Sequence, residues 1–300
     1  MAKKKRRKSK SSKLPRLLFA GCLVLIAIGI LLMINNSNES NASNDVLKDH
    51  SFTATESIAP GEQHNSAEKN YPGLEYVELP ENLTSQIKEY VGFTISFNRE
   101  NGTPNYVAWE LLGSEAQGAK GRSNKFWTDP EIKGCPSTGD YTRSGYDRGH
   151  MCPSGDQKWS DEAMNDCFVM ANICPQKHEL NNGAWKTLET KERQWAKRDS
   201  AIMIVAGPIY EKSDKERIGK AGVRVPSAFF KAIIAPYVDE PRGIAFVYPN
   251  MTAPGNMSDY AMSIDQLEKT LGYDLFPALP DDIENKVEST YSFKEWNSSK

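Results

Sequence analysis

Side chains of the kinds that build zinc sites are scarce in this sequence. It contains four histidines and five cysteines in 300 residues, and no two cysteines form a C-x-x-C pair. Clustered carboxylates, which a two-metal hydrolase requires, are also missing. The pattern weighs against a structural zinc protein, but that alternative stays open because six candidate ligands are present: Cys135, Cys152, Cys167, Cys174, His150 and His178.

Acidic residues are absent from residues 1–16, which hold nine lysines and arginines. Because the whole chain has 37 basic residues, the remainder has 28 of them against 39 acidic ones, although the formal net charge is only −2. A body this acidic does not point to nucleic-acid binding through its overall field. Any site for phosphate groups therefore has to be local.

Charge is also absent from residues 17–34, LLFAGCLVLIAIGILLMI. A helix of this length spans about 27 Å, close to the hydrocarbon thickness of a bilayer. No convincing cleavage site follows, so we predict an uncleaved, single-pass transmembrane signal anchor, with a cleaved signal as the alternative. The basic residues 1–16 should then form a cytoplasmic tail and the C-terminal body should be extracytoplasmic, which means periplasmic or extracellular in a bacterium.

Residues 35–70 are rich in Asn, Ser, Glu and Thr and show no apolar period, which is typical of a disordered linker. The folded part is predicted to begin near residue 71, without internal repeats. In an oxidising compartment its four cysteines could form up to two disulfides, and the sequence leaves their pairing open.

The patterns in this folded part predict an α+β fold with mostly antiparallel strands and few helices. Alternating apolar and polar residues predict a hairpin of residues 89–98 and 105–113 around the turn RENGTP. One amphipathic helix is predicted over residues 183–198, and another from a cap at Ser263 to a stop at Gly272. Further strands are predicted at residues 166–176, 200–210, 227–236 and 242–250.

The stretch YDRGHMCPSGD, residues 146–156, holds one of the few histidines beside an arginine and an aspartate. In an extended chain Arg148 and His150 point to one face and Asp147 to the other, while Gly149 allows close approach. Arginine offers permanent donors to phosphate oxygens, and a neutral histidine can accept a proton from water. The alternative is an ordinary buried histidine.

A second stretch, NICPQKHELNNGAWKTLE, covers residues 172–189. Asn181, Trp185 and Glu189 are four residues apart, so they follow one side of a regular helix. A neutral amide oxygen with a carboxylate deeper in the helix suits Mg²⁺, which keeps much of its hydration and takes few protein ligands. The alternative for Asn181 is a helix-capping turn.

The motifs DRGH, N-x-x-P-Q and L-N-x-x-x-W-x-x-x-E, in this order, resemble the DNA/RNA non-specific endonucleases. These are the ββα-metal (His-Me finger) nucleases that include endonuclease G. The resemblance covers roughly residues 74–280. It implies a nuclease domain over residues 71–300 with a ββα-metal core, and a hydrolase that cleaves phosphodiester bonds of both DNA and RNA.

The resemblance also implies the role of each site residue. His150 matches the general base, and Asn181 matches the residue that binds the single Mg²⁺, for which Mn²⁺ could substitute. Glu189 matches a residue that holds the water on this ion. Three further residues match an arginine on the phosphate, a second arginine further upstream and an asparagine that supports the site: Arg148, Arg122 and Asn172.

The expected partners are DNA, RNA and, through residues 17–34, a membrane. The oligomeric state stays open, with a homodimer as one alternative. A catalytically degenerate member of the family that binds nucleic acid without cleaving it is the second functional alternative. If His150 has an ordinary pKa, activity should fall below about pH 6.5.

Overall fold

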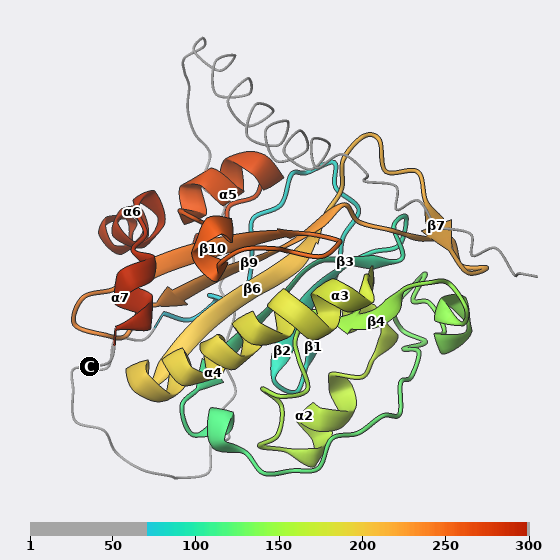
Figure 1. The fold of residues 1–300 in the computed structure, drawn as a ribbon, viewed down its shortest axis with the longest axis horizontal. Coiled ribbons are helices and arrows are strands. Elements are labelled where there is room, and N and C mark those ends of the chain that lie inside the picture. The colour runs from blue at the N-terminus through green and yellow to red at the C-terminus, as the bar shows by residue number, and fades with distance from the viewer. Residues whose placement is uncertain (1–70, 299–300) are drawn as a thin grey trace, which may run out of the picture. The chain divides into compact units, whose positions relative to one another are not determined.

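The computed structural model of this chain describes residues 71–298 (Figure 1). The predicted cytoplasmic tail, transmembrane anchor and linker, at residues 1–16, 17–34 and 35–70, lie outside the described residues. Among the helices of residues 71–298, none combines the length and the apolar character needed to cross a bilayer.

A seven-stranded sheet, in the order β1-β2-β3-β6-β9-β10-β11, forms the centre of the described part (Figure 1). Every neighbouring pair in it is antiparallel. The predicted hairpin is confirmed as β2 and β3, and the predicted strands near residues 200–210, 227–236 and 242–250 are confirmed as β6, β9 and β10. The strands are β1 Gln86–Tyr90, β2 Phe93–Asn98, β3 Thr103–Leu112, β6 Ala201–Ile209, β9 Ala228–Ala235, β10 Arg242–Pro249 and β11 Ala261–Met262.

The two faces of this sheet are covered by different helices, because successive side chains point to opposite sides. On one face, Trp109 and Ile204 belong to a core that includes Leu188 and Trp195 of α4 (Lys186–Asp199). On the other face, α5 (Ile264–Leu271) and α6 (Asp281–Ser289) pack through their apolar side chains, which include Leu267 and Val287. The predicted α+β class is therefore confirmed.

A small, separate two-stranded sheet and the helical segment after it form the ββα unit. β4 (Asp147–His150) pairs antiparallel with β5 (Ile173–Gln176) over four residues. The short α3 (His178–Leu180) follows, and a turn then leads into α4, which lies across the large sheet in Figure 1. The sequence between β4 and β5 contains α2 (Asp161–Asp166). The motifs DRGH and N-x-x-P-Q thus become adjacent strands, and the third motif becomes the helical segment beside them.

The remaining elements are short. The cap at Ser263 and the stop at Gly272 are confirmed for α5, since the Ser263 hydroxyl accepts a hydrogen bond from the Gln266 N–H and Gly272 has a φ of 69°. Other short elements are the hairpin of β7 (Arg217–Ile218) and β8 (Val223–Arg224), α7 (Phe293–Asn297), and 3₁₀ turns at Glu115–Gln117, Thr138–Tyr141, Met170–Asn172 and Met257–Tyr260.

Two predicted elements are shorter than expected. The strand predicted over residues 166–176 is extended only at Ile173–Gln176, because a 3₁₀ turn at Met170–Asn172 precedes it. The helix predicted over residues 183–198 is regular only from Lys186, since Asn181–Trp185 forms a π-helical turn in which Gly183 has φ −111° and ψ −111°. The four-residue spacing of the third motif therefore does not run along one regular helix.

Candidate active site

His150 is the last residue of β4 and is buried between two aromatic rings. The centre of its imidazole is 5.5 Å from that of Phe126 and 4.9 Å from that of Phe168. Its carbonyl oxygen accepts a hydrogen bond of 3.3 Å from the indole nitrogen of Trp185. The imidazole Nε2 is buried and has no hydrogen-bond partner among residues 71–298. The ring is thus held by its neighbours, while its Nε2 makes no hydrogen bond to the described part of the protein.

Arg122 and Arg148 extend over the same two aromatic rings. The guanidinium carbon of Arg148 lies 4.3 Å from the centre of the Phe126 ring, and that of Arg122 lies 5.2 Å from the centre of the Phe168 ring. Arg122 also donates a short hydrogen bond to the Ser154 hydroxyl. His150 and Arg148 both contact Phe126, as expected for side chains on the same side of a strand.

The surroundings of His150 favour its neutral form. Burial lowers the pKa of His150 to about 3, and the positive charges of Arg122 and Arg148 act in the same direction. A backbone hydrogen bond with Arg148 opposes this effect. The expectation of an ordinary pKa near 6.5 is therefore wrong: the imidazole stays unprotonated throughout the neutral and mildly acidic range.

Asn181 is oriented by Asp147, the first residue of β4. The Asn181 side-chain nitrogen donates a hydrogen bond of 2.9 Å to the Asp147 carboxylate, and the same oxygen lies 2.8 Å from Nδ1 of His178. A carboxylate only accepts hydrogen bonds, so the amide nitrogen faces Asp147 and the amide oxygen is left to face a ligand. This role of Asp147 was not predicted from the sequence. Its place in the tetrapeptide with His150 was the available signal.

Glu189 lies in the first turn of α4 and is half-buried. No hydrogen bond or ion pair joins its carboxylate to another residue of the described part. Burial raises the pKa of Glu189 to about 7, the Asp156 and Glu192 carboxylates act in the same direction, and Lys231 and Arg193 oppose them. An unpaired, partly buried carboxylate and an oriented amide oxygen are each of the kind that suits a hydrated divalent cation.

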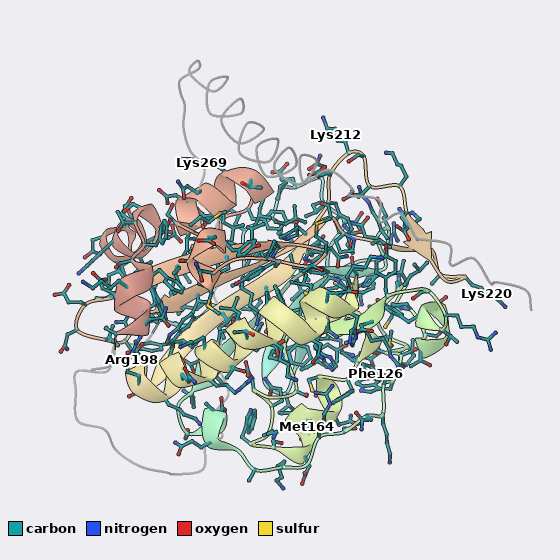
Figure 2. The ribbon with its side chains drawn as sticks, viewed as in Figure 1. Phe126, Met164, Arg198, Lys212, Lys220 and Lys269 are labelled. Carbon is teal, nitrogen blue, oxygen red and sulfur yellow. The ribbon has the colours of Figure 1, made fainter. Side chains whose placement is uncertain are left out.

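A cleft of about 320 Å³ opens beside β4. Asp147, Arg148 and Asn181 line it together with Phe126, which Figure 2 labels, and Tyr146. Its remaining lining residues come from the 3₁₀ turn before β4 and the residue that caps it: Thr138, Tyr141 and Thr142. The structure therefore brings the predicted phosphate-binding arginine and the predicted metal ligand into one cleft. The other predicted site residues do not line it: His150, Arg122, Glu189 and Asn172.

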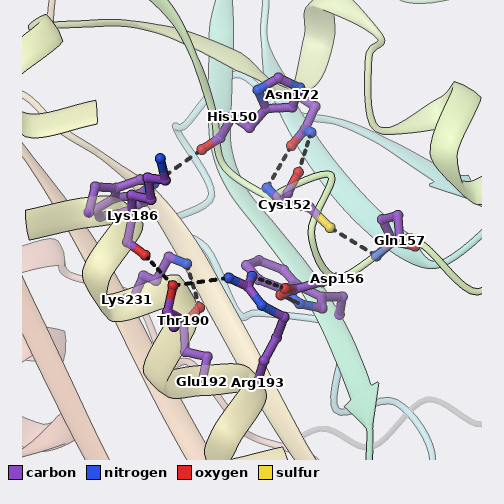
Figure 3. Close-up of polar contacts among 12 residues, drawn as sticks. His150, Cys152, Asp156, Gln157, Asn172, Lys186, Thr190, Glu192, Arg193 and Lys231 are labelled. Carbon is purple, nitrogen blue, oxygen red and sulfur yellow. Dashed lines mark hydrogen bonds and ion pairs between the residues drawn. The ribbon is translucent and has the colours of Figure 1, made fainter. Parts of the chain in front are cut away.

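Asn172 supports the site from within the core. It is fully buried, and its side-chain oxygen accepts a hydrogen bond of 2.9 Å from the Cys152 N–H (Figure 3). Its side-chain nitrogen donates to the carbonyl oxygens of Cys152 and Cys167, at 2.9 and 2.8 Å. Asn172 thus clamps the chain that leaves β4 to the chain that enters β5. It is a positioning residue and does not face the cleft.

A buried charge pair between β9 and α4 was not predicted from the sequence. Lys231 and Glu192 are fully buried, and the Lys231 Nζ lies 2.7 Å from a Glu192 carboxylate oxygen (Figure 3). The Lys231 Nζ also lies 4.8 Å from the centre of the Trp185 ring, whose nitrogen holds His150. A lone lysine inside the apolar strand FFKAII was the available signal, since lysine is rarely buried without a partner.

A second ion pair lies next to this one. Arg193 of α4 is 2.8 Å from a carboxylate oxygen of the buried Asp156, which also accepts a hydrogen bond of 3.2 Å from the Trp109 indole (Figure 3). The chain after His150 is thereby tied both to α4 and to β3. This contact fixes the position of α4 relative to the end of the DRGH motif.

The cysteines of the described part are free thiols, so neither of the two disulfides left open by the sequence is formed: Cys135, Cys152, Cys167 and Cys174. Burial raises the pKa of Cys152 and Cys174 well above the ordinary value, which disfavours the thiolates that zinc requires. Within residues 71–298, the group of acidic, histidine or cysteine side chains close enough to hold a metal contains neither cysteine nor histidine.

Comparisons with known proteins identify the family of this chain. The family described as DNA/RNA non-specific endonuclease matches residues 70–282. The mitochondrial nuclease EXOG of Danio rerio is 33% identical over 220 residues, which cover 67% of this chain and 63% of that protein. The mitochondrial nuclease of Saccharomyces cerevisiae is 34% identical, with 63% of this chain and 64% of that protein covered. For the nuclease of Serratia marcescens the identity is 30%, with 66% and 77% covered.

The chain spans a little under two thirds of the length of the first of these relatives. Among solved structures, this chain is similar to the crystal structure of the EndoG/EndoGI complex, with a TM-score of 0.63. The identity is 24%, and the match covers 69% of this chain and 92% of that chain, which supports the fold. On the match over residues 70–282, this chain belongs to the DNA/RNA non-specific endonuclease family.

Proposed function

We propose that this protein is an endonuclease that hydrolyses the phosphodiester bonds of DNA and RNA, with one Mg²⁺ and His150 as the general base. Membership of the family supports this proposal. The observation that carries it is the state of His150. Its Nε2 has no protein partner within the described part, and burial, together with the charges of Arg122 and Arg148, keeps the ring neutral.

His150 would take the proton from the attacking water at Nε2. General-base help of this kind contributes about 10²–10⁴ in rate. The negative charge that builds on the phosphate would be met by Arg148, which lines the cleft and offers a planar fork of donors to phosphate oxygens. Arg122 would add a second donor, held in place by its hydrogen bond to Ser154.

The oriented oxygen of Asn181 would hold the ion, and Glu189 would hold the water that surrounds it. Asp147 would act through Asn181 by fixing the amide. Bound Mg²⁺ supplies Lewis-acid stabilisation of the phosphate oxygens and of the departing oxygen. Mn²⁺ is expected to substitute, because it also takes oxygen ligands.

Recognition would be of the nucleic-acid backbone, which explains why DNA and RNA could both be substrates. Contacts to phosphate and sugar carry no base sequence. The Lys177 Nζ lies 4.0 Å from the centre of the ring of Tyr146, which lines the cleft, so Lys177 would add positive charge near the cleft. Cleavage should therefore weaken steeply as salt increases.

The placement of this activity is proposed from the sequence alone. A single-pass anchor at residues 17–34 would put the nuclease domain, residues 71–300, outside the cytoplasm, with residues 35–70 as the linker. A homodimer remains one alternative for the assembly, which size-exclusion chromatography with light scattering would determine.

A plasmid-nicking assay on the full chain tests the proposed activity. Cleavage should require Mg²⁺ or Mn²⁺, and His150→Ala should lower the rate by about 10²–10⁴ while DNA binding in EDTA and the melting temperature stay close to wild type. Binding without cleavage by the wild-type protein would instead support the degenerate alternative. Near-normal turnover by His150→Ala would remove His150 as the base.

A further inference from the structure

A group of three carboxylates lies where α5 meets α6, outside the ββα unit. Asp265 and Glu268 are one helical turn apart on α5, and Glu288 lies in the last turn of α6. One oxygen from each of the three lies within 4.8 Å of the others. Figure 1 shows the two helices beside each other, and Figure 2 labels Lys269 on α5.

Glu288 is the buried member of this group. Its residue is 5% exposed, and its Oε1 has no hydrogen-bond partner in the described part of the chain. Asp265 and Glu268 are half-buried. A buried carboxylate oxygen without a partner is costly, so it requires either a proton or a cation.

Acidic side chains from α5, from α6 and from the segment between them surround Glu288. Burial raises the pKa of Glu288 to about 9, and Glu268, Glu284, Asp274 and Asp265 act in the same direction. The nearby lysine of α6, Lys286, pairs instead with Glu240 at 2.5 Å. The protein thus concentrates negative charge at this contact.

We propose that Asp265, Glu268 and Glu288 bind a divalent cation, Ca²⁺, at the contact between α5 and α6. All three donors are carboxylate oxygens, which select a hard cation. Ca²⁺ suits them better than Mg²⁺, because it accepts six to eight oxygens in flexible geometry while Mg²⁺ demands a near-ideal octahedron.

This site is separate from the proposed catalytic one. α5 and α6 pack on the face of the large sheet opposite to α4. α6 sits directly on β10, since a Cβ at Gly243 would come within 2.2 Å of the Val287 carbonyl oxygen. A cation that joins Glu288 to α5 would therefore stabilise the C-terminal helices on the sheet without touching the reacting groups.

Calcium binding to the full chain, stripped of metal and then titrated with Ca²⁺, tests this inference. The background is Asn181→Ala, so that binding at the proposed catalytic site does not contribute. Equilibrium dialysis should give one Ca²⁺ per chain, and Ca²⁺ a hundredfold above its Kd should raise the Tm by about 5 °C or more. Both effects should disappear in Glu288→Gln, which keeps the shape of the side chain.

Glu284→Gln is the matched control, since Glu284 lies one turn earlier on α6 and outside the three-carboxylate group. It should keep the bound Ca²⁺ and its effect on Tm. If Glu288→Gln does not fold, Asp265→Asn should weaken Ca²⁺ binding at least tenfold. An unchanged Ca²⁺ titration in Glu288→Gln, or in Asp265→Asn if Glu288→Gln does not fold, would overturn the proposal. A second result would also overturn it: the Tm of the unsubstituted site does not change with Ca²⁺, while metal-free Glu288→Gln has a higher Tm. This result would show that the carboxyl groups share a proton instead of binding a cation.

Discussion

The Asn181 side-chain amide donates a hydrogen bond of 2.9 Å to the Asp147 carboxylate. This contact joins the helical segment that carries the proposed metal ligand to the strand that ends at His150. It also decides which end of the amide faces the cleft, because only the nitrogen can donate to a carboxylate. The geometry of the proposed metal site therefore depends on Asp147 as well as on Asn181.

Asp147→Asn should raise the Mg²⁺ concentration needed for half-maximal nicking by about 10- to 100-fold, because an amide at this position can pair with either end of the Asn181 side chain and no longer fixes its orientation. The cleavage rate should recover at saturating Mg²⁺, since the reacting groups remain. His178→Ala is the control: His178 contacts the same carboxylate but is largely exposed, so its removal should change the Mg²⁺ requirement little. Identical Mg²⁺ titrations for wild type and Asp147→Asn would contradict the role given to Asp147.

His150 should make the protein less stable as the pH falls. The pKa of His150 is about 3 in the folded protein and about 6.5 in an unfolded chain, so below pH 6.5 the unfolded state takes up a proton that the folded state does not. At pH 5 this difference amounts to about 2 kcal/mol. Urea unfolding at pH 7.5 and pH 5 should show that wild type loses about that much more stability than His150→Asn. Parallel losses in the two proteins would show that His150 titrates normally.

Protons and Mg²⁺ should compete at Glu189. Its pKa is raised to about 7 without a cation, and a bound cation favours the carboxylate. The acid limb of kcat/KM against pH should therefore move to lower pH by about one unit for each tenfold rise in Mg²⁺ in the competing range. In Glu189→Gln the limb should no longer depend on Mg²⁺. A wild-type limb that stays at one pH at all Mg²⁺ concentrations would exclude Glu189 as its origin.

The buried pair of Lys231 and Glu192 should be costly to break and much less costly to remove. Lys231→Met leaves an unpaired buried carboxylate and should lower the free energy of unfolding by about 3–5 kcal/mol. The double variant Lys231→Met/Glu192→Met removes both charges and should lose less than Lys231→Met alone. Urea unfolding of the single and double variants checks this. Additive losses would show that the two side chains are not energetically coupled.

The strands could be predicted because a separate hydrophobic core packs on each face of the large sheet. Alternation is informative in β3, where Trp109 and Ala108 belong to different cores. The helix α5 could be placed to within a residue because Ser263 and Gly272 act locally, through a side-chain cap and a positive φ. Features of this kind depend only on a few neighbouring residues, so they can be predicted from the sequence.

The parts that were missed depend on contacts between distant segments. The π-helical turn before α4 accompanies the placement of Trp185 on the His150 carbonyl, 35 residues away. The spacing of Asn181, Trp185 and Glu189 fits a regular helix equally well, so the sequence alone could not reveal the turn. Similarly, the pKa of His150 is set largely by burial and by Arg122, 28 positions upstream in the sequence. Neither can be deduced from the DRGH motif.

The ladder of β4 and β5 contains only four residue pairs and stands apart from the seven-stranded sheet. A ladder this small can open as a local unit while the rest of the protein stays folded. The stability of this unit would then set the upper temperature limit of the proposed activity. The hydrogen bonds of Asn172 and Trp185 stabilise the unit. On heating, the proposed cleavage activity would then be lost below the temperature of the calorimetric transition, and it would return on cooling.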